Sequence, residues 1–144
     1  MDIQTLKLLV AESDVNEIID QYLPNEGAVE NLLVRLKPEG VHVEGDYPTP
    51  LGKMSFETLW SLTASGSIVR AKLEAIKVAG LPAGMLRSVL LKTIRDVAER
   101  EPGVRVEDEA IEINVEEAAT ARGVALRINL KALRCSEGSL VVEA

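Results

Sequence analysis

The two side chains best suited to chemistry, one histidine and one cysteine, lie far apart in this sequence of 144 residues. His42 belongs to a segment in which polar and apolar residues alternate, and Glu44 follows on the same face of that predicted strand. No Gly-x-Ser-x-Gly motif and no partner motif accompany the histidine, so a hydrolase triad has no support. Cys135 stands near the end of another predicted strand, where a free cysteine usually packs as a small hydrophobe. We therefore expect no catalytic residue and no enzymatic activity.

Metal and cofactor motifs are also missing from the sequence. A single cysteine excludes an internal disulfide and any zinc site built from several cysteines. The acidic cluster 107–109 lacks the spaced oxygen ligands of a calcium loop and is typical of a solvated turn. Gly80, Gly84 and Gly103 occur without the neighbouring residues that make a phosphate-binding glycine loop. The sequence thus predicts no metal ion and no cofactor.

Charge and composition limit the partners that this chain can have. Its net charge of −7 disfavours binding to the phosphates of nucleic acid. With 47% hydrophobic, 27% charged and only 3% aromatic residues, it should fold around an aliphatic core. Its apolar runs are shorter than the roughly 20 residues that span a membrane, and its first residues lack the features of a secretory signal. We expect a cytoplasmic protein with no nucleic-acid partner and no transmembrane segment.

One region is basic within this acidic chain. Residues 118–136 contain no acidic side chain but include four cations, among them Arg127 and Lys131 on one face of a predicted strand. An ordinary solvated strand face fits this pattern. If the strand instead lies beside another basic strand, the two form a strip that contacts an anionic headgroup or the acidic surface of a partner. Arg127 and Lys131 are the residues that we predict for such an anion contact.

Helical periodicity occurs at the beginning of the chain and in its middle. Apolar residues recur every three or four positions from Asp2 to Leu23, which predicts an N-terminal helix. A more apolar helix is predicted from Pro82 to about Glu101, because a first-turn proline opens it and the pair Pro102-Gly103 ends it. At about 19 residues this helix would be roughly 29 Å long. No other predicted helix is as apolar, so a sheet is its natural partner.

Alternation of apolar and polar residues predicts strands on both sides of the long helix. Residues 31–37 and 41–47 form a predicted hairpin, since both arms alternate and Pro38-Glu39-Gly40 suits a tight turn. Met54 to Thr63 and Ile68 to Val78 form a second pair. Strands joined by hairpins before and after a helix predict an antiparallel α+β fold. The chain is expected to be one domain, residues 1–144, with a helical segment 1–23, strands in 29–78, the long helix 82–101, and strands in 104–144 with a connector helix at 116–121.

The predicted strands carry more apolar surface than the predicted helices cover. About eight strands make a large area for one long helix and one N-terminal helix. If the sheet curls tightly around the long helix, the core is closed. If it does not, an apolar groove remains that can hold an acyl chain or a second protomer. The residues expected to line such a groove are Met54, Phe56, Trp60, Leu86, Leu90 and Ile94.

The order of several short segments resembles a known family. Leu36 to Gly45, the strand pair that begins at Met54, and Val78 to Pro82 at the start of an apolar helix follow one another, and Leu140 to Val142 closes the chain. This order resembles small bacterial proteins related to the tubular lipid-binding superfamily. Relatives in that superfamily include the bactericidal/permeability-increasing protein and the mannan-elongation lipid-binding factor. The resemblance is one of pattern and carries over no catalytic residue.

The resemblance implies a strongly curved antiparallel sheet wrapped around one long helix, with an apolar interior suited to lipid. Because this chain is shorter than those relatives, either a full lipid tunnel requires a homodimer or there is no such tunnel. We therefore predict a non-enzymatic module that binds a lipid, an acyl chain or another apolar ligand. The alternative is a cytoplasmic protein-interaction module that self-associates through a sheet edge or apolar patch, with a closed core and no ligand.

Overall fold

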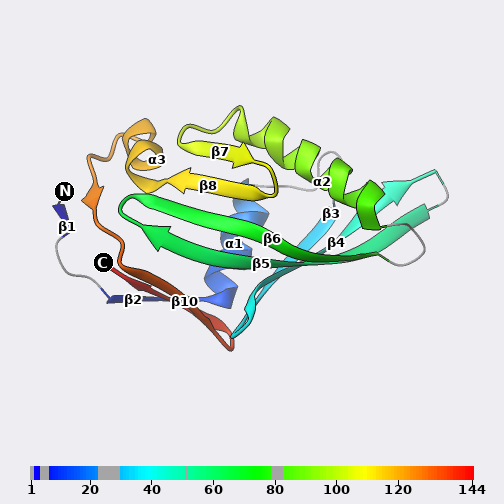
Figure 1. Ribbon diagram of the computed structural model, residues 1–144, viewed down its shortest axis with the longest axis horizontal. Coiled ribbons are helices and arrows are strands. Elements are labelled where there is room, and N and C mark those ends of the chain that lie inside the picture. The colour runs from blue at the N-terminus through cyan, green and yellow to red at the C-terminus, as the bar shows by residue number, and fades with distance from the viewer. Residues whose placement is uncertain (1, 4–6, 23–29, 51, 79–82) are drawn as a thin grey trace.

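Strands make up most of the chain in the computed structural model, which describes residues 2–3, 7–22, 30–50, 52–78 and 83–144. Figure 1 shows a long, twisted and open sheet, with α2 along one side of it and a smaller sheet crossing near its other end. The predicted architecture, a strongly curved sheet wrapped around one long helix, is therefore wrong. Within the described ranges the helices are α1 (Glu12–Tyr22), α2 (Ala83–Ala98) and α3 (Val115–Ala121).

The larger sheet has six antiparallel strands in the spatial order β3-β4-β5-β6-β8-β7. Their bounds are β3 (Glu30–Lys37), β4 (Gly40–Thr49), β5 (Gly52–Ser65), β6 (Ile68–Val78), β7 (Val104–Glu107) and β8 (Ala110–Asn114). The first four strands follow one another as a meander, which confirms both predicted hairpins. The register places Val41 of β4 opposite Trp60 of β5, and Trp60 opposite Leu73 of β6. These three residues therefore share one face of the sheet.

A separate sheet joins the two ends of the chain. It contains β2 (Lys7–Ala11), β10 (Ala132–Ser136) and β11 (Ser139–Glu143), in the order β10-β11-β2. A short parallel pair, β1 (Asp2–Ile3) with β9 (Arg127–Ile128), lies apart from both larger sheets. The predicted strand that carries Arg127 and Lys131 is thus broken: β9 ends at Ile128, and Leu130 forms an isolated bridge with Gly66.

The predicted N-terminal helix from Asp2 to Leu23 is wrong over its first half. Residues of β2 pair with β11 near the other end of the chain, and the helix begins only at Glu12. The Asp14 side chain accepts a hydrogen bond from the N–H of Ala11 at 3.3 Å, where the strand turns into α1. Leu23 lies outside the described residues. A partner strand more than a hundred residues away outweighs the local helical spacing of the leucines.

α2 covers only part of the apolar face of the larger sheet. It has 16 residues and ends at Ala98, earlier than the predicted Glu101, while Pro82 lies outside the described residues. α2 packs on β6 and β7 (Figure 1). Farther along the sheet, β10 contacts β3, β4 and β5. The second sheet thus covers apolar surface of the larger sheet that α2 does not reach. The larger sheet stays open and does not curl around the helix.

The opposite face of the larger sheet is polar and carries ion pairs between neighbouring strands. Arg35 of β3 pairs with Glu44 of β4 through Nε and Oε1 at 3.2 Å. Glu112 of β8 lies between two arginines, with Oε1 at 2.8 Å from Nη1 of Arg70 and Oε2 at 3.0 Å from Nη2 of Arg105. Both arginines stand directly opposite Glu112 in the strand register. Such cross-strand pairs favour this register and keep the face solvated.

Glu112 should contribute to the loss of stability in acid. The hydrogen bond from Arg105, together with that from Arg70, lowers the pKa of the Glu112 carboxyl against the opposing effect of desolvation. A carboxyl whose pKa is lowered by folding stabilises the fold above its unfolded pKa of about 4.3, and this contribution disappears as the pH falls through the folded pKa. We expect Glu112→Gln to show a shallower decline of unfolding free energy below about pH 5. Urea unfolding at a series of pH values measures this, and a decline as steep as that of the wild type would contradict it.

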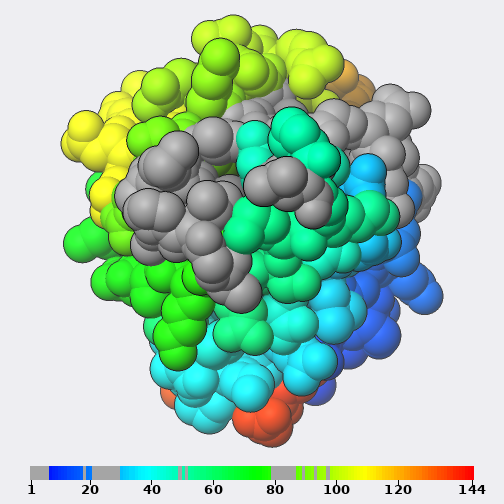
Figure 2. All heavy atoms as spheres, turned by 90° about the vertical axis from the view of Figure 1, so that its right-hand side faces the viewer, coloured from blue at the N-terminus to red at the C-terminus, as the bar shows by residue number. Residues whose placement is uncertain are grey.

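Side chains from α1 cover the outer edge of β3. Asn16 accepts a hydrogen bond from the N–H of Val34 at 2.7 Å and donates one to the C=O of Val34 at 2.9 Å, as a neighbouring strand would. The N–H of Leu36 donates to Glu12 Oε1 at 2.7 Å, and its C=O accepts from the N–H of Gly138 at 2.8 Å. Figure 2 shows α1 beside β3, with the turn between β10 and β11 below it. This edge is therefore closed to further strands at these positions.

Removing the Asn16 side chain should weaken the fold and expose this edge. Asn16→Ala leaves the buried N–H and C=O of Val34 without partners, which costs about 1–3 kcal/mol. Asn129→Ala, at an exposed position, is the control and should change stability by less than about 0.5 kcal/mol. Urea denaturation measures both variants. An Asn16→Ala cost as small as that of the control would show that the two bonds do not hold α1 against β3.

Candidate functional site

Three of the six residues predicted to line an apolar groove meet in the core. Trp60 of β5 and Leu90 of α2 are buried and form one cluster with Leu73 of β6. Ile94 of α2 packs against this cluster. Side chains from the helix thus lie directly on the sheet, and we interpret this region as packed protein core.

The other three predicted lining residues are placed differently. Phe56 of β5 is 2% exposed and lies so close to Gly45 of β4 that an added Cβ there would be 2.8 Å from the ring. Met54 is half-buried near the beginning of the same strand. Leu86 belongs to α2, but its side chain is outside the described part of the structure. Phe56 therefore packs against β4 at Gly45, where any residue with a Cβ would collide with the phenyl ring.

The polar groups of this core are paired with one another. The indole Nε1 of Trp60 donates to Thr58 Oγ1 at 2.8 Å, and Thr58 Oγ1 donates to the C=O of Val43 at 3.0 Å. Among the described residues, no buried side-chain nitrogen or oxygen lacks a hydrogen-bond partner. Ligand sites usually orient their ligand through a few convergent polar groups. In the described core, no buried polar side chain is left unpaired to orient a ligand.

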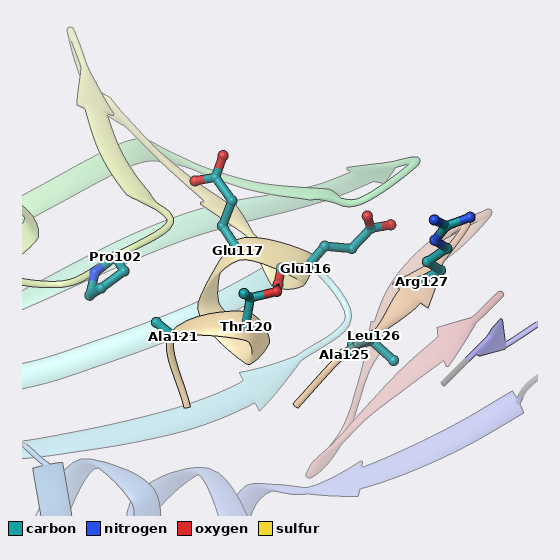
Figure 3. Close-up of a pocket in the computed structure, with 8 residues that line it drawn as sticks. All are labelled: Pro102, Glu116, Glu117, Thr120, Ala121, Ala125, Leu126 and Arg127. Atoms are coloured by element: carbon teal, nitrogen blue, oxygen red, sulfur yellow. Dashed lines mark hydrogen bonds between the residues drawn. The ribbon is translucent and has the colours of Figure 1, made fainter. Parts of the chain in front are cut away.

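A cleft of about 670 Å³ lies beside α3, away from the predicted lining residues (Figure 3). Glu116 is directed toward the strand that carries Arg127, whereas Glu117 points away from it. The Glu116 carboxylate accepts a hydrogen bond from the N–H of Ile128 at 3.1 Å, and the Thr120 hydroxyl donates to the C=O of Glu116 at 2.9 Å. These contacts hold α3 against β9, so we assign them a structural role.

The histidine and the cysteine lie near a second, smaller cavity. This cavity, of about 390 Å³, is lined by Cys135 and Glu39 among others, and Glu39 Oε1 lies 2.9 Å from Nε2 of His42. Burial raises the pKa of the Cys135 thiol, which makes the nucleophilic thiolate scarcer at neutral pH. Within the described ranges, no cluster of acidic, histidine or cysteine side chains could hold a metal ion. The described geometry therefore lends no support to catalysis here.

The basic strip expected around Arg127 and Lys131 does not form as a continuous surface. Both side chains are exposed, but Arg127 shares its cleft with two glutamates. Of the neighbouring cations, Arg122 pairs with Glu101, and Arg134 pairs with Glu143. Anion contact by Arg127 and Lys131 thus stays a prediction, with a mixed rather than a basic surface around them.

The most unusual surface in the described chain is the outer edge of β2. Leu8 is 48% exposed and Leu9 is 67% exposed, although both belong to a strand. β2 is the last strand of its sheet, and no described strand lies beyond it. An exposed apolar edge strand is a template for pairing with another chain. This edge is our candidate site, defined by the residues Lys7–Ala11.

Sequence reasoning missed this site because Leu9 fitted a helical repeat. A boundary signal was present, since Ser13 and Asp14 can cap a helix and follow a short apolar run. That signal separates α1 from the preceding residues but does not say which strand they join. Only the pairing with β11 makes them an edge.

Comparison with known proteins adds no relative to this picture. No helix in the described ranges is long and apolar enough to cross a membrane. No protein family matches the chain, and neither a curated protein nor a solved structure shows significant similarity to it.

Proposed function

We propose that this chain is a non-enzymatic interaction module that associates with a second copy through the outer edge of β2. The exposed Leu9 carries the proposal, because side chains from α1 cover the edge of β3, whereas no described residue pairs with the outer edge of β2. Natural proteins usually block or charge such edges. We therefore expect a partner to cover this open edge and its two exposed leucines.

Lipid binding has less support from the described residues. The predicted lining side chains Trp60, Leu90 and Ile94 pack in one cluster between helix and sheet. The two cavities described above are lined by other residues. An acyl chain would have to displace packed core side chains, which costs several kcal/mol for large residues.

Hydrophobic burial supplies the driving force for association at β2. Removing a leucine side chain from water stabilises by about 1.5–3 kcal/mol, and each copy contributes its own Leu9. A five-residue edge makes a small interface, so we expect association that depends strongly on concentration. The core needs no rearrangement, because β2 is already extended in the monomer.

Analytical ultracentrifugation over a range of concentrations tests this proposal. The weight-average mass should rise from 15.6 kDa toward twice that value as the concentration increases. Leu9→Lys should raise the dissociation constant more than about tenfold, since it places two cations together and loses over 1.4 kcal/mol of burial. Leu33→Lys is the control, because Leu33 is also an exposed strand leucine but lies in the covered strand β3. A strict monomer at about 1 mM, or equal effects of the two variants, would sink the proposal.

A further inference from the structure

We infer that two copies pair antiparallel through β2 about a two-fold axis at Leu9, so that Leu9 of one copy lies opposite Leu9 of the other. This inference rests on the proposed self-association and adds its geometry: the direction of pairing, the register and the charges that fit. Each copy contributes its sheet of β10, β11 and β2, and the two sheets would then continue into one sheet across the axis.

The backbone groups at the free edge belong to alternate residues. The N–H of Ala11 donates to the Asp14 carboxylate rather than to β11. The C=O of Glu143, opposite Lys7 in the register, accepts from the N–H of Lys131 and so faces away from β2. Because the direction of these groups alternates along a strand, the N–H and C=O of Lys7, Leu9 and Ala11 point to the free edge.

These three outward residues are symmetric about Leu9. Antiparallel pairing places Leu9 opposite Leu9 of the second copy, and Lys7 opposite its Ala11. The two Leu9 residues can exchange two backbone hydrogen bonds, and each Lys7 N–H can donate to the C=O of the opposite Ala11, whose own N–H stays bonded to Asp14. The arrangement is isologous and closes as a dimer, whereas a head-to-tail contact would continue into a fibre.

The side chains also suit this register. Leu9 stands opposite Val141 of β11 in its own sheet, and the axis would place a second Leu9 and Val141 beside them. Cross-strand contacts between such apolar side chains stabilise a sheet. The pair of Leu9 side chains becomes the centre of a continuous apolar row, which accounts for its exposure in the single chain.

Charge supplies an independent argument for the second copy as the partner. Lys7 would lie opposite Ala11 of the other copy, and the Asp14 carboxylate is bound to the N–H of that residue. Neither Lys7 nor Asp14 takes part in an ion pair among the described residues. The two-fold axis therefore brings an unpaired cation and an unpaired anion together twice.

Disulfide trapping tests the register. In a Cys135→Ser background, Leu9→Cys should form a covalent dimer under mild oxidation, because directly opposite Cα atoms about 5.5 Å apart suit a disulfide. Lys7→Cys alone should not, since residue 7 of the second copy lies opposite Ala11, four residues away along the strand. A mixture of Lys7→Cys and Ala11→Cys should cross-link. Cross-linking of Lys7→Cys alone, or none with Leu9→Cys, would overturn the register even if ultracentrifugation still shows a dimer.

Charge reversal tests the contact between Lys7 and Asp14. Lys7→Glu and Asp14→Lys should each weaken the dimer at least threefold, because each places like charges together twice. The double variant should recover the wild-type affinity, since it restores the attraction with the charges exchanged. Circular dichroism checks that all three fold. A double variant that dimerises no better than the singles would overturn the proposed contact, while dimerisation lost only in Leu9→Lys would leave the proposed function standing.

Discussion

Trp60→Ala should destabilise the fold by about 3–5 kcal/mol, the range for truncating a buried tryptophan. The side chain is 6% exposed and packs between Leu73 of β6 and Leu90 of α2. Its loss removes one of the contacts between α2 and the sheet and leaves Thr58 without the indole donor. Because Trp60 is the only tryptophan, unfolding must be followed by far-ultraviolet circular dichroism rather than by its fluorescence.

Trp60→Phe is the matched variant for this measurement. It keeps most of the ring volume but loses the N–H that donates to Thr58, so we expect a smaller cost than for alanine. A cost below about 1 kcal/mol for Trp60→Ala would mean that a cavity under α2 hardly lowers the free energy of unfolding. That result would contradict the closed core and favour an apolar cavity at this position.

Gly40→Ala should cost about 2–5 kcal/mol, from backbone strain and from steric overlap. Gly40 begins β4 with φ of +145°, a conformation that residues with a Cβ rarely adopt. An added Cβ would lie 2.4 Å from the backbone oxygen of Trp60 in β5. The backbone of a central strand cannot move aside as a flexible side chain could, so the strands must separate locally.

Gly52→Ala separates the two contributions to this cost. Gly52 also has a positive φ, of +116°, but a Cβ there meets no atom within 4 Å. It should therefore show the strain alone, about 1–3 kcal/mol. Thermal or urea unfolding of both variants gives the difference. Equal costs would show that the close approach between Gly40 and Trp60 has no energetic consequence.

The sequence predicted those elements whose partners are close in the chain. The hairpin around Pro38-Glu39-Gly40 and the connector helix at 116–121 appear in the structure because turn residues and alternation act locally. Residues 7–11 form a strand because they pair with β11, near the other end of the chain. The local spacing of residues cannot predict a partner so far away in sequence. For the same reason the helix after Pro82 was foreseen, but not the open sheet on which it lies.

The candidate site divides in a similar way. Trp60 of the alternating strand meets Leu90 and Ile94 of the periodic helix in the core, but neither kind of periodicity distinguishes a packed core from one that lines a ligand. The exposure of Leu9 depends on β2 being the last strand of its sheet, which is a property of the topology. Amphipathic patterns thus identify what is buried against something, and the assembled sheets identify what remains open.

Hydrogen exchange at the backbone amide of Leu9 tests the central claim most directly. This N–H points to the free edge of β2, whereas the N–H of Val10 points toward β11 and serves as the internal control. Exchange followed by nuclear magnetic resonance should slow at Leu9 at least tenfold when the protein is concentrated, with Val10 unchanged. Rapid exchange at Leu9 at every concentration would contradict pairing through β2.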